Sequence, residues 1–184
     1  MKGWALYVLT APQNQLEPAL INLVASWRQT GHPVPLEVWQ AALPHRRIAW
    51  VDGRCHDLWW EFALKHSFRW QGHVAGLSAA ECAIRTRELA RRFRLMGLMD
   101  QRVEDLTCAE RARADLAAAL LARPDLLIWE EPFALLSMVE RRLVAEEVRD
   151  LVLNHGLTVV AASQSPQGLI GIGPQSQSEQ RALS

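Results

Sequence analysis

Short apolar runs alternate with helical patterns along most of this 184-residue chain, and this alternation is what most restricts its fold. Apolar runs of this length, bounded by turn residues, predict buried strands, whereas apolar residues spaced three and four apart predict helices. The predicted strands span 4–10, 48–51, 125–129 and 157–162. The predicted helices span 16–28, 55–67, 78–96, 107–122 and 138–153. Strands that alternate with helices imply a parallel sheet covered on both faces, so we predict an α/β fold.

Two of these helices begin with a capping box, in which a Ser or Thr side chain and a Glu three residues later satisfy each other's backbone amides. The first box is Ser78 with Glu81, and the second is Thr107 with Glu110. These boxes fix two helix starts in the middle of the chain.

Composition excludes several classes of function. The formal net charge is zero, which argues against a nucleic-acid binder that works through bulk charge. Cys55, Cys82 and Cys108 form no CxxC pair, a pattern typical of a reduced cytosolic protein. The six histidines show no metal-ligand spacing, and no apolar run reaches membrane-spanning length. We therefore expect no metal site, no nucleic-acid partner and no direct membrane insertion.

Tryptophan is unusually frequent, with eight residues in the chain. Indole rings add much to a core, but they are also enriched at the centres of protein interfaces. We expect most of them in the core and two or three on a docking surface.

The stretch from Leu106 to Ser137 resembles the signature helix, Walker B strand and D-loop of the ATP-binding-cassette (ABC) ATPases, and the resemblance runs from about Trp4 to Ser163. It implies a P-loop NTPase (RecA-like) parallel-sheet core in residues 1–165, with a helical insertion at about 55–105. The remaining residues, 166–184, are rich in Gly, Ser, Gln and Pro, so we expect a flexible tail there. The resemblance also implies that the family's N-terminal β-subdomain, which stacks an aromatic residue on adenine, is missing.

The phosphate loop of that family has no counterpart in sequence here. Family members use glycines whose amides hold phosphate, a lysine that reaches the outer phosphates and a hydroxyl that binds Mg²⁺. The matching segment runs Ala11-Pro12-Gln13-Asn14-Gln15-Leu16-Glu17-Pro18-Ala19. Glu17 stands at the lysine position, Pro18 at the hydroxyl position and Leu16 at the last glycine. The degenerate loop positions are Ala11, Asn14, Leu16, Glu17 and Pro18.

The charge at Glu17 decides against nucleotide binding. A lysine attracts a triphosphate and a carboxylate repels it, each by roughly several kcal/mol at an effective dielectric near 20. A micromolar site has only about 8 kcal/mol in total. We therefore expect no bound cofactor, with ATP and Mg²⁺ involved only if a partner's site is shared. The same segment also reads as an ordinary turn with a proline near a helix start.

The other motifs of the family have drifted as well. The residue matching its Mg²⁺-sensing glutamine is Gly53, and the D-loop aspartate is replaced by Ser137. The signature reads Leu106-Thr107-Cys108-Ala109-Glu110, so its hydroxyl survives and both glycines are lost. Thr107 and Glu110 remain a residual signature, although a capping box that needs no ligand explains them better.

The Walker B match ends in Glu130 and Glu131, and the switch histidine is replaced by Gln164. In the family an aspartate holds Mg²⁺ and the following glutamate activates water. Glu131 keeps the second type, and Glu130 is one methylene longer than the aspartate. The resemblance therefore implies that Glu130, Glu131 and Gln164 are vestigial.

Two segments are candidate partner-binding surfaces. In ABC transporters a helix of the membrane subunit enters a groove beside the region that matches 56–62. Here that region carries an aromatic cluster that helical spacing cannot bury on one face. The second candidate is the arginine-rich helix, which also reads as a solvated face. The candidate residues are Trp59, Trp60, Phe62, Trp70, Arg85, Arg91 and Arg92.

The sequence thus predicts a catalytically inactive ABC-type pseudo-ATPase that serves as a structural or regulatory subunit of a membrane transport or assembly complex. Its expected partners are a competent ABC ATPase subunit, a membrane permease, or both, which would hold it in the cytoplasm at the inner face of the membrane. Two alternatives stay open. One is an atypical ATP-hydrolysing transporter subunit that uses Glu131, and the other is a soluble protein–protein adaptor.

Overall fold

A computed structural model describes residues 5–10, 16–52, 58–164 and 169 of the chain. Four strands are present in these ranges: β1 (Ala5–Leu9), β2 (Ile48–Val51), β3 (Leu126–Glu130) and β4 (Thr158–Ser163). The α-helices are α1 (Pro18–Thr30), α2 (Leu36–Ala42), α3 (Leu64–Val74), α4 (Ala79–Arg92), α5 (Cys108–Ala119) and α6 (Met138–His155). Three short 3₁₀ turns complete them: η1 (Met96–Leu98), η2 (Val103–Asp105) and η3 (Leu120–Ala122).

The four strands form one sheet in the order β1-β4-β3-β2. β2, β3 and β4 run parallel, as the alternation of strands and helices predicts. β1 instead runs antiparallel to β4, with Ala5 opposite Ser163 and Leu9 opposite Val159. The end of β1 therefore lies at the edge of the sheet where β3 and β4 begin, which the sequence did not predict.

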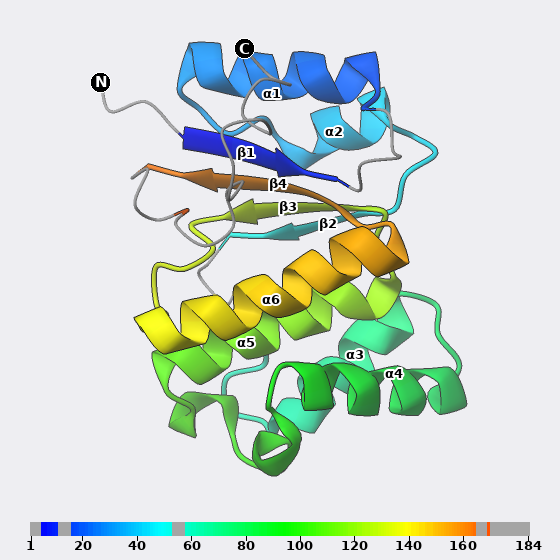
Figure 1. Ribbon diagram of the computed structural model, residues 1–184. Coiled ribbons are helices and arrows are strands. Elements are labelled where there is room, and N and C mark those ends of the chain that lie inside the picture. Colours follow the sequence, from blue (N-terminus) through cyan, green and yellow to red (C-terminus); the bar gives the residue numbers. More distant parts are fainter. Residues whose placement is uncertain (1–4, 11–15, 53–57, 165–168, 170–184) are drawn as a thin grey trace.

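Helices cover both faces of the sheet (Figure 1). α1 and α2 lie on one face, whereas α5 and α6 lie on the other, with α3 and α4 beyond them. Side chains of β3 alternate between the two layers, as expected for a strand buried on both faces. Leu126 and Ile128 pack with α1 and α2, and Leu127 and Trp129 pack in the core on the side of α5 and α6. The mixed α/β layering predicted from the sequence is thus present.

Most predicted elements match the structure to within a few residues; one predicted helix is wrong and one observed helix was not predicted. The helix predicted for 55–67 is wrong, because α3 begins only at Leu64. The backbone before it pairs with a distant segment instead: Phe62 and Trp60 accept hydrogen bonds from the amides of Val103 and Glu104. α2 was not predicted, and it is one of the shortest helices, with no side-chain cap at its start.

The helix starts follow their capping boxes. Ser78 with Glu81 and Thr107 with Glu110 make both reciprocal hydrogen bonds, which confirms the two predicted helix starts. A third box, which the sequence analysis did not identify, joins Ser137 to Glu140 at the start of α6. Each box satisfies amides that a helix start otherwise leaves unpaired.

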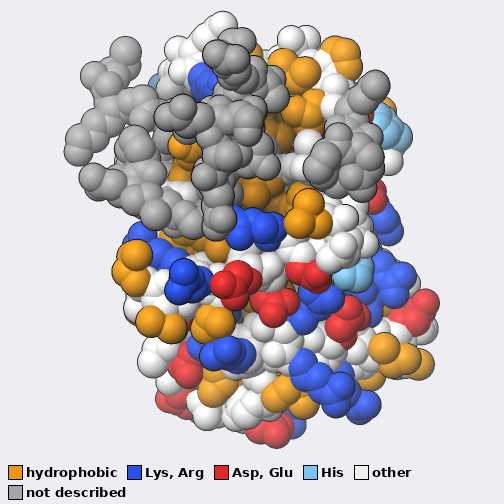
Figure 2. Space-filling view, viewed as in Figure 1, with side chains coloured by type: hydrophobic (Ala, Val, Ile, Leu, Met, Phe, Trp, Pro, Cys, Tyr) orange, Lys and Arg blue, Asp and Glu red, His pale blue; other side chains and the backbone are white. Residues whose placement is uncertain are grey.

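No helix in the described ranges is long and apolar enough to cross a membrane. Within the same ranges, no three His, Cys, Asp or Glu side chains gather in a way that would hold a metal ion. On the face shown in Figure 2, acidic and basic side chains lie intermixed rather than as a field of one sign.

Candidate functional site

The carboxylates of the Walker B match lie at the carboxyl edge of the sheet, at the end of β3. Both oxygens of Glu131 accept hydrogen bonds: Ser163 Oγ donates to Oε2 at 2.7 Å, and the Gln164 amide donates to Oε1 at 2.7 Å. The Glu131 amide in turn donates to the Ala162 carbonyl at 2.7 Å. The structure therefore brings Glu131 and Gln164 together, and their contact ties the ends of β3 and β4 to each other.

Glu131 also adopts an unusual backbone conformation. Its φ of 46° lies in the left-handed region, which costs a residue with a Cβ about 1 kcal/mol or more. The three hydrogen bonds to β4 and Gln164 hold it there. Glu130, just before it, is half-buried at the end of the strand.

Glu17, which stands at the position of the family lysine, lies at the opposite edge of the sheet. Its carboxylate accepts a 2.6 Å hydrogen bond from Arg46 Nε and lies 2.9 Å from His45 Nε2. Arg46 also donates to the carbonyl of Asp125, the residue that precedes β3. Glu17 is thus held by two basic side chains at the amino end of β3.

A second ion pair, between Arg47 and Asp125, lies at the same amino edge of the sheet. Arg47 donates to both carboxylate oxygens of Asp125, at 2.8 and 3.1 Å. The hydrogen bond from Arg47, helped by the charges of Arg47 and Arg46, holds the pKa of Asp125 below its ordinary value, although burial opposes this. The carboxylates at this edge are therefore neutralised from within the chain.

The direction of β1 explains this separation. Because β1 runs antiparallel to β4, the chain leaves it at the amino edge, and α1 starts there. The five residues of β3 then separate Glu17 from Glu131 by about 17 Å at roughly 3.3 Å per residue. Leu16 is half-buried and Pro18 is exposed at the start of α1, on the same side as Glu17. Ala11, Asn14 and Gly53 lie outside the described residues.

The signature match forms a closed turn at the start of α5. Thr107 Oγ1 accepts from the Glu110 amide at 3.2 Å, and Glu110 Oε2 accepts from both the amide and the hydroxyl of Thr107 at 2.8 Å. Cys108 follows as an exposed thiol whose Sγ accepts from Arg111 Nη2 at 3.4 Å. The Thr107 hydroxyl and the Glu110 carboxylate are therefore engaged with each other.

Ser137, at the D-loop position, has the same kind of engagement. Its Oγ donates to Glu140 Oε2 at 2.7 Å and accepts from the Glu140 amide at 3.4 Å. The hydrogen bonds from Ser137 hold the pKa of Glu140 below its ordinary value against the effect of burial. Ser137 therefore acts as a helix cap in this chain.

The predicted aromatic residues come together on the surface, and with their neighbours we call them the aromatic surface. Its members are Trp59, Trp60, Phe62, His66, Trp70, His73 and Arg111. The Trp59 ring lies 5.7 Å from Phe62 and 5.4 Å from Trp70, and the Arg111 guanidinium lies 4.5 Å over the Trp60 ring. Trp59 is 39%, Trp60 50%, Phe62 53% and Trp70 45% exposed. Exposed rings in mutual contact are a known mark of an interaction surface.

Other tryptophans belong to the core. Trp27 and Trp39 are fully buried between the sheet and the first two helices, and Trp129 is buried against Phe133. The described tryptophans therefore divide between core and surface, as the sequence analysis expects.

Hydrogen bonds to neighbouring elements fix the backbone that carries these rings. Ser67, fully buried on α3, accepts a 2.8 Å hydrogen bond from the Trp59 amide through its Oγ. The pairing of Phe62 and Trp60 with the segment 103–104 holds the other side of the turn. Trp59 therefore has a fixed backbone, although it lies in a turn and not in a helix.

This anchor can be tested with Ser67→Ala. We expect a loss of about 1–2 kcal/mol in the free energy of unfolding, because the Trp59 amide loses its partner in a half-buried position. Urea denaturation followed by far-UV circular dichroism measures this. Ser26→Ala, at an exposed position of α1, is the matched control and is expected to change stability by less than about 0.5 kcal/mol. An equal loss in both variants would show that the Ser67 contact does not fix the turn.

Two of the three candidate arginines make contacts inside the chain. Arg85 donates to the carbonyls of Leu121 and Leu120 at 3.0 and 2.9 Å, and so satisfies the end of the α5–η3 segment. Arg92 donates to Asp150 at 2.6 Å and to Glu147 at 3.4 Å, and so ties α4 to α6. Of the three, only Arg91 is exposed, and it lies on α4, a different helix from the one that carries Trp70.

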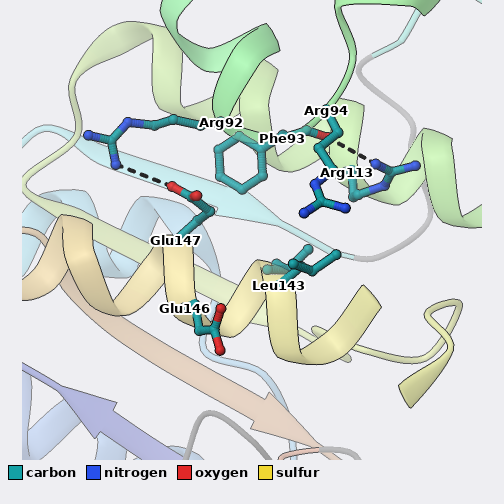
Figure 3. Close-up of a pocket in the computed structure, with 8 residues that line it drawn as sticks. Arg92, Phe93, Arg94, Arg113, Leu143, Glu146 and Glu147 are labelled. Carbon is teal, nitrogen blue, oxygen red and sulfur yellow. Dashed lines mark hydrogen bonds and ion pairs between the residues drawn. The ribbon is translucent and has the colours of Figure 1, made fainter. Parts of the chain in front are cut away.

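A small cavity of about 50 Å³ lies beside Arg92, where α4, α5 and α6 meet. Its lining residues are Arg92, Phe93, Arg94, Arg113, Leu143, Val144, Glu146 and Glu147. Figure 3 shows the dashed contacts from Arg92 to Glu147 and from Arg113 to the Phe93 carbonyl across it. Its volume suits a water molecule or two rather than a nucleotide.

Sequence analysis missed several residues that the structure adds to the aromatic surface. His66 and His73 lie on one stripe of α3 with the predicted Trp70, and the spacing of four and three residues is the signal that would have found them. The signal was obscured because the helix was placed too early in the chain. Arg111 belongs to a different helix, and nothing in the sequence links it to Trp60.

Comparison with known proteins gives relatives of one kind. The chain is 33% identical over 130 residues to the Nod factor export ATP-binding protein I of Cupriavidus metallidurans, which covers 71% of this chain and 41% of that protein. It is 29% identical over 126 residues to the lipoprotein-releasing system ATP-binding protein LolD of Nitratidesulfovibrio vulgaris, covering 68% of this chain and 54% of the relative. No family model matches the chain. The chain spans about half the length of these relatives.

Solved structures give the same fold. A dimeric ATP-binding cassette bound to ADP and phosphate superposes with a TM-score of 0.59 at 16% identity, covering 76% of this chain and 60% of that one. An inward-facing metal-chelate type ABC transporter superposes with a TM-score of 0.58 at 14% identity, covering 70% and 53%. These likenesses confirm the predicted P-loop NTPase fold class.

Proposed function

We propose that this chain, a homologue of the ATP-binding domains of ABC transporters, is a catalytically inactive structural or regulatory subunit of a membrane transport or assembly complex. The observation that carries the proposal is the position of Glu17 and the start of α1 at the amino edge of the sheet, about 17 Å of strand away from Glu131. A nucleotide site needs the cation, the helix start and the carboxylates within a few ångströms of one triphosphate.

The chemistry at each edge supports the same proposal. At the amino edge Glu17 presents a carboxylate that is already paired with Arg46 and His45, where a phosphate site would need a cation. α1 also begins with Pro18, which has no backbone amide to donate. At the carboxyl edge both oxygens of Glu131 accept hydrogen bonds from the chain itself. Among the residues that the structure describes, neither edge combines donors for phosphate with a carboxylate for Mg²⁺ and water.

The start of α5 is also poorly suited to complete an ATP site on a partner subunit. A competent ATPase would need the hydroxyl and amides at the start of α5, yet Thr107 and Glu110 satisfy each other there. The carboxylate of Glu110 at this helix start also repels a γ-phosphate. We therefore place the function in protein contacts rather than in shared nucleotide chemistry.

The aromatic surface is the proposed docking site for that contact. Its four exposed rings lie on the segment that follows β2 and on α3, where the sequence resemblance places the groove for a membrane subunit. Arg85 and Arg92 are left out of the proposed surface because their guanidinium groups satisfy contacts within the chain. Docking on a permease or a competent ATPase would hold the chain at the cytoplasmic face of the membrane.

Nucleotide binding is the first test. We expect a fluorescent ATP analogue with Mg²⁺ to give no saturable binding to the chain below about 1 mM, whereas a competent ABC ATP-binding domain serves as the positive control. Glu131→Gln is expected to leave this result unchanged, because Glu131 has no substrate to act on. Micromolar, Mg²⁺-dependent binding that changes in Glu131→Gln would instead identify an atypical ATPase.

Partner binding is the second half of the same test. The full chain carrying an affinity tag is expected to retain a membrane permease or an ABC ATPase from membranes solubilised in mild detergent. Trp59→Ala with Trp70→Ala is expected to lose it, whereas Arg91→Ala, exposed on α4, retains it. Retention of a soluble protein alone would favour the adaptor alternative.

A further inference from the structure

β2 is an edge strand whose outer side has no neighbouring strand among the described residues. It is the last strand in the sheet order β1-β4-β3-β2 and pairs there with β3 alone (Figure 1). Ile48, Ala49 and Trp50 are half-buried, whereas every residue of β4 is buried. Because α2 and α5 contact the two faces of β2, its outer side is the exposed part.

The hydrogen-bonding groups on this outer side follow from the pairing of β2 with β3. The Arg47 carbonyl accepts from the amides of Asp125 and Leu126 at 2.8 and 3.2 Å, so Arg47 faces β3. Successive residues of a strand direct their amide and carbonyl groups to opposite sides. The amides and carbonyls of Ile48 and Trp50 therefore face outward, and no hydrogen bond from another described residue reaches them.

β2 also lacks the features that protect many edge strands. Such strands carry Lys, Pro or inward-pointing charges that stop another strand from pairing with them. The stretch Ile48–Val51 contains none of these residues. At the opposite end of the sheet, by contrast, Arg28 Nη2 donates to the Leu6 carbonyl of β1 at 2.8 Å. The outer side of β2 is therefore the better template for an added strand.

The residues of β2 suit a second copy of the same strand. In an antiparallel pair with a two-fold axis at Ala49, the outward groups of Ile48 exchange both backbone hydrogen bonds with those of Trp50 of the second copy. A β-branched side chain opposite an aromatic ring is a favourable cross-strand pair. Trp50 is already held in place by stacking on Trp27, with ring centroids 6.2 Å apart.

The charged residues beside β2 are compatible with this register. Arg46 comes next to Asp52 of the second copy at both ends of the pair, so opposite charges meet and like charges do not. Arg46 also pairs with Glu17, and Arg47 pairs with Asp125, so the acidic groups at the amino edge are already neutralised. The new charge contact therefore helps to fix the register, whereas backbone hydrogen bonds and apolar contacts supply the affinity.

We propose that the chain forms a homodimer in which two β2 strands pair antiparallel and join the two sheets into one. Backbone hydrogen bonding to an exposed sheet edge is a common mode of recognition, and a two-fold axis lets each copy contribute the same surface. The inference goes beyond the proposed function, because a second copy requires neither a permease nor a nucleotide.

A disulfide at the two-fold axis tests the geometry of this pair. The two copies of Ala49 form a non-hydrogen-bonded pair with Cα atoms about 4.5 Å apart, a separation that suits a disulfide. In the full chain carrying Cys55→Ser and Cys108→Ser, we expect Ala49→Cys to form a covalent dimer at least about tenfold faster than Val38→Cys under mild oxidation. Val38 is 45% exposed on α2, so its rate reports random collision.

Sedimentation velocity measures the association itself. We expect the unmodified chain to be dimeric at about 100 µM protein. Ile48→Pro is expected to weaken the dimer by at least about tenfold, because proline removes an outward amide that makes no hydrogen bond to another described residue. Ile48→Val keeps that amide and a β-branched side chain, so it is the matched control and is expected to change the affinity by less than about twofold.

A chain that is monomeric at this concentration overturns the proposal. So does a dimer that a folded Ile48→Pro variant leaves unchanged, or an Ala49→Cys variant that cross-links no faster than Val38→Cys, because another surface then joins the copies. Where circular dichroism shows Ile48→Pro to be unfolded, the two cross-linking rates decide. None of these results depends on whether the chain binds nucleotide.

Discussion

Replacing Glu17 with lysine, the residue that the family uses at this position, is expected to destabilise the protein without creating a nucleotide site. The new ammonium group would face Arg46 and His45, which now pair with the carboxylate of Glu17. Glu17 and Arg46 are both largely buried, with 27% and 19% of their side chains exposed, so the repulsion is only partly screened. We expect a loss of about 2–3 kcal/mol in the free energy of unfolding.

Urea denaturation of Glu17→Lys measures this loss, and titration with the ATP analogue measures binding. Glu17→Gln is the intermediate control, expected to lose about 1 kcal/mol because it keeps the shape but not the charge. Glu146→Lys, the same reversal at an exposed position of α6, is expected to change stability by less than about 0.5 kcal/mol. A stable Glu17→Lys variant that binds Mg²⁺-ATP would show that the lysine alone restores the site.

The second large effect is expected at Gly72, where α3 packs against Cys82 of α4. A Cβ at this position would lie 2.3 Å from Cys82 Sγ and 3.1 Å from Cys82 Cβ, inside the contact distance of either atom. Cys82 is buried and its thiol lies 3.7 Å from the Phe68 carbonyl, so it has little room to move. Gly72→Ala is therefore expected to lose about 2–3 kcal/mol through overpacking.

A double-mutant cycle tests the cause of that loss. Cys82→Ala removes the sulfur, so the pair Gly72→Ala with Cys82→Ala is expected to recover about 1–2 kcal/mol relative to the sum of the single changes. Gly97→Ala is the control, because a Cβ there meets nothing within 4 Å. Additive losses in the cycle would mean that Cys82 is not the obstacle. Because α3 carries Trp70, the same variants also report how far the aromatic surface depends on this close contact.

The framework of the fold was predictable from sequence because its signals are local. Each helix start with a capping box was placed to within a residue, since Thr107 and Glu110 or Ser78 and Glu81 fix it without help from distant parts. The inner strands β3 and β4 are continuous apolar runs, typical of strands buried on both faces.

The predictions that were wrong concern features that distant parts of the chain determine. The direction of β1 cannot be read from its own residues, because Ala5–Leu9 would be equally apolar in either orientation. The start of α3 is set by Gln101, Val103 and Glu104, which pair with the backbone of 60–64 and keep the residues before Leu64 out of the helix. The propensity of 55–67 to form a helix gives way to these tertiary contacts.

In the candidate site, too, local features were predicted and contacts between distant residues were not. Residue types alone predicted that Glu17 departs from the chemistry of the ABC ATPases. They also predicted that Thr107 and Glu131 keep a part of it. Only the structure places Glu17 with Arg46 and Glu131 with Ser163, because these partners lie 29 and 32 residues away along the chain. The aromatic surface was half predicted: the rings were named, whereas the cations beside them come from α3 and α5.

The pairing of β1 with β4 has a consequence for how the protein forms during synthesis. Ala5 lies opposite Ser163, so the first strand has no neighbour until nearly the whole described chain has left the ribosome. Until then Leu6, Leu20 and Trp27 lack the part of their apolar cover that Val160 and Ala162 supply. The apolar layer made by β1, α1 and α2 is thus completed only when β4 takes its place in the sheet.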